Sequence, residues 1–146
     1  MSLEELQENR LLRSESEVTA FEAALAALAE VPNANLLPQL HLVLDDDCAN
    51  YEVMFGLVHF LEAFELELQI GAFLEVLPQL DVQAPLWSKI LHFRILNDDS
   101  ARECYRQIIS RQSEPSLSKA RAILETIVEE EDGPLKDAAK SVLSAI

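Results

Sequence analysis

Apolar residues recur at the spacing of an α-helix along almost the whole sequence. Two of these runs are Val18, Phe21, Leu25 and Leu28, and Ala101, Cys104, Tyr105 and Ile108. A period near 3.6 residues gives a helix one apolar stripe, whereas a half-buried strand needs a period of two, and the sequence has no comparable run of that kind. The pattern therefore predicts an all-α protein.

Boundary residues divide this pattern into nine helices. We expect them near residues 3–13, 17–31, 34–44, 49–64, 66–77, 84–97, 99–112, 116–131 and 134–145. The signals are N-capping side chains, prolines suited to a first turn and a glycine suited to a helix end: Asn33, Asp99 and Ser116; Pro38, Pro85 and Pro134; and Gly133. The connections are short, so neighbouring helices should pack antiparallel, and the length suits a single helical domain over residues 1–146.

Two short motifs occur twice. LPQL at residues 37–40 returns at 77–80, and LVHFL at 57–61 resembles ILHFR at 90–94. The first copy holds seven more residues between its motifs than the second, and the stretch 45–51 is the candidate for this excess. Repeats of this length are typical of stacked helix pairs. The sequence thus predicts antiparallel helix pairs in a HEAT-like array, with a globular all-α bundle as the alternative.

Glycine is scarce: only Gly56, Gly71 and Gly133 occur, and they form no GxG. The Walker phosphate loop, the dinucleotide fingerprint and the GxSxG nucleophile elbow are therefore excluded. We expect neither a cofactor nor enzymatic activity.

The sequence is strongly acidic, with a formal net charge of −15. Between Arg13 and Lys89 it has thirteen carboxylates and no Lys or Arg, whereas the stretch from Lys89 onward is nearly balanced. Such a charge disfavours nucleic acid, whose phosphates bind to basic faces, and favours a cationic partner.

The two cysteines, Cys48 and Cys104, form no CxxC motif, which is typical of reduced thiols in a cytoplasmic protein. The first residues lack the features of a signal peptide, and no uncharged stretch reaches the length of a membrane span. We therefore expect a cytoplasmic chain that does not bind a membrane.

The helix expected at residues 49–64 is apolar nearly all round, so we expect it to be central and mostly buried. Its one polar or small stripe holds Glu52, Gly56, His59 and Ala63, with Glu62 beside it. A histidine near carboxylates suits general-base catalysis, but no nucleophile motif accompanies it. A hydrogen-bonding or surface histidine is the better interpretation.

The three histidines, His41, His59 and His92, lack the spacing of a metal site. Stacked repeats could still bring His59 beside His92. We expect no bound metal.

Asp45, Asp46 and Asp47 follow one another in the stretch that interrupts the first repeat. They lack the alternating ligands and the glycine of a calcium loop, which leaves a solvated loop or an electrostatic contact surface. Tyr51 and Trp87 follow this stretch and a proline corner, where an aromatic side chain either fills the core or anchors a partner.

Four segments carry a family resemblance: LLPQL at 36–40, EVMFGLVHFLE at 52–62, APLW at 84–87 and RILN at 94–97. Together they resemble the Immunity protein 30 family of bacterial polymorphic toxin systems. The resemblance is good over residues 36–97, loose over 118–143 and absent from 1–30. The family implies a small cytosolic protein that binds and neutralises a toxin domain made by the same or a neighbouring cell.

The resemblance and the charge lead to the same function. An inhibitor of a nuclease must cover a cationic cleft built to hold phosphates, and carboxylates on a rigid scaffold fit such a cleft. We therefore expect an immunity protein that binds a basic toxin domain, for example a nuclease, through an acidic surface. The alternative is a helical-repeat adaptor for another protein. The expected partner-binding residues are Asp45, Asp46, Asp47, Tyr51, Glu52, His59, Glu62 and Trp87.

Overall fold

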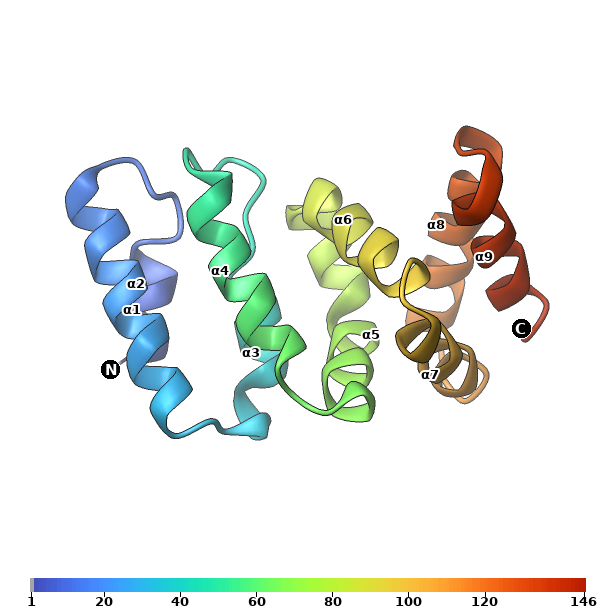
Figure 1. Ribbon diagram of the computed structural model, residues 1–146, viewed down its shortest axis with the longest axis horizontal. Coiled ribbons are helices and arrows are strands. Elements are labelled where there is room, and N and C mark those ends of the chain that lie inside the picture. Colours follow the sequence, from blue (N-terminus) through green and yellow to red (C-terminus); the bar gives the residue numbers. More distant parts are fainter. Residues whose placement is uncertain (1) are drawn as a thin grey trace.

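The computed structural model describes residues 2–146, and within this range it has nine α-helices, one 3₁₀ turn and no strand. The helices are α1 (Ser2–Glu8), α2 (Glu15–Glu30), α3 (Leu37–His41), α4 (Tyr51–Glu62), α5 (Leu66–Gln83), α6 (Pro85–Leu96), α7 (Asp99–Ile109), α8 (Ser116–Glu130) and α9 (Gly133–Leu143), and the 3₁₀ turn is Ala34–Leu36. They follow one another along the longest axis, with the two ends of the chain at opposite sides (Figure 1). The all-α prediction is confirmed. None of the helices in residues 2–146 is long and apolar enough to cross a membrane.

The helix limits agree with the predicted ones to within a few residues, except at α1, α3 and α5. The expected break of α5 at residue 77 is wrong, because the helix continues to Gln83 with Pro78 inside it. A proline in a helix lacks an N–H donor and costs about 3 kcal/mol or more. The turn beyond Pro78 fully buries Leu80, and Ala84 after it is buried as well. We infer that this packing offsets the cost of the proline.

Three boundary residues have other roles than predicted. Asp98, and not Asp99, caps α7, since its carboxylate accepts a hydrogen bond from the backbone N–H of Ala101 at 2.8 Å. Ser116 is the first residue of α8 and does not cap it. Gly133 begins α9 with a φ of 66°, a left-handed conformation that glycine adopts without strain, and does not end α8.

The buried hydrophobic side chains form a continuous core cluster, in which α5 has the most neighbours. It packs against α3, α4, α6, α7 and α8. Its buried side chains are Ile70, Phe73, Leu74, Leu77 and Leu80. The central helix is therefore α5, whereas the sequence predicted that place for the helix at 49–64.

The helix α4 is buried on one side only. The buried residues are Met54, Leu57, Val58 and Leu61. The predicted polar stripe faces outward, with Glu52, His59 and Ala63 exposed and Gly56 half-buried. Aromatic side chains at the border of the buried side, such as Phe55 and Phe60, are half-buried, and they make the helix apolar over most of its circumference.

The two LPQL motifs lie in α3 and α5, which pack against each other. Residues 42–50 connect α3 to α4, whereas Ala84 alone separates α5 from α6. The extra residues of the first copy therefore fall in this loop. The HEAT-like arrangement of the helix pairs stays a prediction.

Candidate partner-binding surface

The loop of residues 42–50 caps a helix that lies far along the chain. The Asp46 carboxylate accepts hydrogen bonds from the backbone N–H groups of Leu86 and Trp87, at 2.9 and 3.1 Å. Both groups belong to the first turn of α6, whose own N-cap residue, Ala84, offers no side-chain acceptor. A carboxylate at this end of a helix also interacts favourably with the helix dipole. Asp46 thus fixes the start of α6.

Other contacts hold the same loop against the turn that follows α1, against α4 and against α6. Asp45 forms an ion pair with Arg10, with 3.0 Å between Oδ2 and Nε, and accepts the Asp47 N–H at 2.8 Å. The Trp87 indole N–H donates to the Asp45 carbonyl at 3.0 Å, and the Tyr51 hydroxyl donates to the Asp46 carbonyl at 2.6 Å. Asp47 is the one member of the acidic triple whose side chain is exposed. The loop is therefore an ordered part of the scaffold that presents Asp47 to solvent.

Trp87 is 0% exposed. Its ring stacks on Tyr51 and meets the edge of Phe55, with 5.0 Å between ring centroids in both pairs. Of the two roles considered for Trp87, the structure supports the core, and the side chain offers no surface to a partner. Tyr51 is half-buried, and burial, with the Asp46 charge second, raises the pKa of its hydroxyl.

Glu62 already has a cationic partner within the chain. Its two carboxylate oxygens accept hydrogen bonds from Nε and Nη2 of Arg94 at 2.6 and 2.8 Å. These hydrogen bonds raise the pKa of Arg94, whose guanidinium also lies over the Phe55 ring at 5.9 Å from its centroid. The pair ties the C-terminal ends of α4 and α6 together.

A groove runs between α2 and α4. It is lined by Glu22, Leu25, Ala26 and Ala29 from α2 and by Val53, Gly56, His59 and Phe60 from α4. Its volume is about 430 Å³. Both of its alanines are exposed, as are Glu22 and His59. The helices approach each other at Gly56, where an added Cβ would lie 3.5 Å from Cδ2 of Leu25. Of the predicted site residues, His59 lines the groove and the exposed Glu52 precedes it on α4.

Uncompensated negative charge lies on the two helices that form this groove and on the loop before α4, although only Glu22 lines the groove itself. Five exposed carboxylates on α2, α4 and the loop before α4 have no ion pair within residues 2–146: Glu15, Glu22, Glu30, Asp47 and Glu52. The two bases that precede them in the sequence are already paired, Arg10 with Asp45 and Arg13 with Glu17. Hydrogen bonds from Arg13 lower the pKa of Glu17 to about 2. This part of the surface therefore attracts cations.

The histidines take structural or surface positions. His92 is buried, and its Nδ1 donates to the Ser88 carbonyl at 2.9 Å, since a carbonyl can only accept. Its Nε2 therefore accepts from the Tyr105 hydroxyl, at 2.8 Å. His41 is also buried, and its Nδ1 donates to the Leu37 carbonyl at 2.7 Å. Burial lowers the pKa of both histidines to about 4.

His59 and His92 lie in different surroundings, one exposed and one buried. The His92 ring contacts Phe73 and Tyr105, while the ring of His59 lies next to Phe55 on the exposed side of α4. Within residues 2–146 no group of three His, Cys, Asp or Glu side chains could hold a metal ion.

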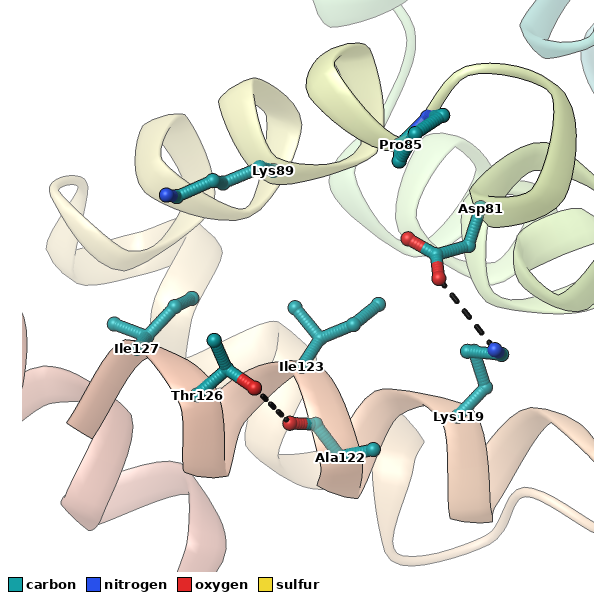
Figure 2. Close-up of a pocket in the computed structure, with 8 residues that line it drawn as sticks. All are labelled: Asp81, Pro85, Lys89, Lys119, Ala122, Ile123, Thr126 and Ile127. Carbon is teal, nitrogen blue, oxygen red and sulfur yellow. Dashed lines mark hydrogen bonds and ion pairs between the residues drawn. The ribbon is translucent and has the colours of Figure 1, made fainter. Parts of the chain in front are cut away.

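A second groove lies toward the C-terminal end, between α5, α6 and α8 (Figure 2). Its volume is about 270 Å³, and two lysines border it. Lys119 forms an ion pair with Asp81 (Figure 2), with 3.5 Å between Nζ and Oδ2. Lys89 forms another with Glu130, with 3.4 Å between Nζ and Oε1. Since its cations are already neutralised, this groove has no net charge that would attract an anionic ligand.

The fold and these surfaces define an all-α protein with an open groove between α2 and α4. The sequence pattern of the Immunity protein 30 family matches residues 8–105 of the 146-residue chain. The chain belongs to this family. Comparisons with curated proteins and with solved structures found no match.

The family match differs in extent from the resemblance found in the sequence motifs. It begins at residue 8 and so includes α2, for which the motifs gave no resemblance. It ends at residue 105, within α7, so the loose resemblance over 118–143 lies outside it.

The sequence patterns did not point to the α2 side of the groove. Alanines in a helix such as Ala26 and Ala29 carry no chemical signal of their own. Their spacing with Glu22 places all three on one face of α2, and that exposed, alanine-rich face was the signal available.

Proposed function

We propose that this chain is an immunity protein that binds a basic toxin domain, such as a nuclease, and neutralises it by covering its cationic cleft. The family supplies the class of partner. The observation that carries the proposal is the stretch of thirteen carboxylates between Arg13 and Lys89. Five of them, on α2, α4 and the loop before α4, are exposed and have no ion pair within residues 2–146. The carboxylates of such a surface repel one another, so a cationic partner stabilises it. Their electric field also speeds association with a basic toxin domain.

The predicted site residues divide into two groups under this proposal. Asp47, Glu52 and His59 are exposed and contact the toxin directly. The remaining five, which are Asp45, Asp46, Tyr51, Glu62 and Trp87, hold the loop of residues 42–50, α4 and α6 in place through their hydrogen bonds and ring contacts. Inhibition results from binding alone, in the cytoplasm, where both cysteines stay free.

The test uses the purified C-terminal domain of the toxin encoded directly upstream of this chain's gene. Association rates are measured against ionic strength for the wild type and for the double variant Asp47→Asn, Glu52→Gln. Removing two exposed charges from the binding surface should slow association and flatten its salt dependence. The matched control, Glu129→Gln with Asp132→Asn, removes two exposed carboxylates, one in the last turn of α8 and one just before α9, and should keep the wild-type salt dependence.

Equal rates and slopes for the two double variants would show that the acidic surface is not the binding surface. A wild-type chain that neither binds the toxin domain nor protects cells that express it would overturn the immunity function itself.

A further inference from the structure

We propose that the groove between α2 and α4 holds an α-helix of the toxin, with a face of small or aliphatic residues bordered by Lys or Arg. This inference rests on the proposed function and specifies which part of the partner the groove accepts.

The shape of the groove suits a helix. α2 and α4 pack against each other and run in the same direction (Figure 1). The lining residues repeat every three or four positions on both helices, so each helix presents one continuous face along the groove. A ridge of side chains on a third helix packs into such a groove. Ala26, Ala29 and Gly56 add little bulk, which lets the backbone of that helix approach closely.

The backbone chemistry also favours a helix over an extended segment. An extended peptide gains affinity by pairing its N–H and C=O groups with those of a sheet edge. Both walls of this groove are helices, whose backbone groups are already bonded within each helix. A helical segment brings a satisfied backbone and needs only side-chain contacts.

The charge of the groove specifies the borders of the partner helix. Glu22 lies in the groove, exposed and without an ion pair in residues 2–146. Glu15 and Glu52 lie near the N-terminal ends of α2 and α4, and Glu30 ends α2. Neither helix contains Lys or Arg. Lysines or arginines along both borders of the partner helix would therefore meet carboxylates that have no ion pair in the part of the chain that the structure describes.

The second groove, shown in Figure 2, does not carry a comparable inference. Its lysines face Asp81 and Glu130 of the same chain, so nothing there specifies the charge of an occupant.

The first experiment fills the groove. Ala26 and Ala27 are adjacent exposed residues of α2, and Ala26 lines the groove while Ala27 does not. Ala26→Tyr should weaken binding of the toxin domain by about 30-fold or more, the loss typical of a buried interface centre, whereas Ala27→Tyr should stay within about threefold. Circular dichroism and urea unfolding verify that both variants fold like the wild type.

A second pair of variants separates local contact from the general field. Glu22→Gln and Glu75→Gln each remove one exposed carboxylate of the acidic stretch, but only Glu22 lines the groove. Loss of a paired interface charge should weaken binding by about tenfold or more for Glu22→Gln, and Glu75→Gln should change it by less than about threefold.

A third measurement does not depend on altered affinity. A photoreactive amino acid replaces Ala29, which lines the α2–α4 groove, or Ala122, which lines the second groove. Cross-links from position 29 to a Lys- or Arg-bearing helix of the toxin would support the inference.

If the wild type binds the toxin domain, the proposed function stands, and three outcomes would then overturn the inference about the groove alone. These are equal affinities of the two tyrosine variants, equal affinities of the two glutamine variants, and cross-links from position 122 with none from position 29. Absence of wild-type binding would instead overturn the proposed function, as described above.

Discussion

Asp46 and Asp47 are neighbours in the sequence and have opposite environments in the structure. The carboxylate of Asp46 accepts two backbone N–H groups of α6, whereas the side chain of Asp47 is exposed. The sequence shows three equivalent aspartates, because the helix that distinguishes them begins about forty residues later. Charge alone therefore does not tell which carboxylate is available to a partner.

Asp46→Ala should lower the free energy of unfolding by about 1 to 2 kcal/mol, the cost of a lost N-cap, because the backbone N–H groups of Leu86 and Trp87 lose the carboxylate that accepts from them. Asp47→Ala removes the same number of atoms and should change stability by less than about 0.5 kcal/mol. Urea denaturation of both variants measures the difference. Equal losses would contradict the capping role.

At the scale of the helices, local spacing predicts which segments are helical but not which helices touch. The helices and the exposed stripe of α4 follow from periodicity, which depends on residues within a few turns. The Glu62–Arg94 pair joins residues 32 positions apart, and the α2–α4 groove joins two helices with a third between them in the sequence. Local patterns carry no information about such contacts. For the same reason the sequence placed α4, and not α5, at the centre.

The buried side of α4 gives a quantitative test. Leu61 is 2% exposed, and Leu61→Ala should cost about 2 to 5 kcal/mol through lost transfer energy and a residual cavity. Leu68, on the neighbouring helix α5, is 46% exposed and provides the same substitution at the surface. Leu68→Ala should cost less than about 1 kcal/mol in urea denaturation. A loss below about 1 kcal/mol for Leu61→Ala would mean that α4 is packed differently.

At the scale of the whole molecule, two features act on stability in opposite directions as the pH falls. The net charge of −15 opposes compactness, and protonation of the carboxylates near pH 4 relieves it. His41 and His92 are neutral and buried, so their protonation opposes the folded state. The histidines titrate first in the unfolded chain, near pH 6.5, well above the range in which exposed carboxylates are protonated.

We therefore predict that the chain loses stability as the pH falls from 7 to 5.5. The pKa of His41 and of His92 is lowered to about 4 in the folded state, so the unfolded chain binds more protons throughout this window. The free energy of unfolding then falls with falling pH, by about 1 kcal/mol for each histidine between these two values. Urea denaturation at both pH values measures this, and His92→Gln should remove about half of the dependence because one of the two titrating rings is gone.

His59→Gln, at an exposed position of α4, is the control and should keep the wild-type dependence. A pH dependence that His92→Gln leaves intact, or that His59→Gln abolishes, would contradict the assignment of this effect to the buried rings.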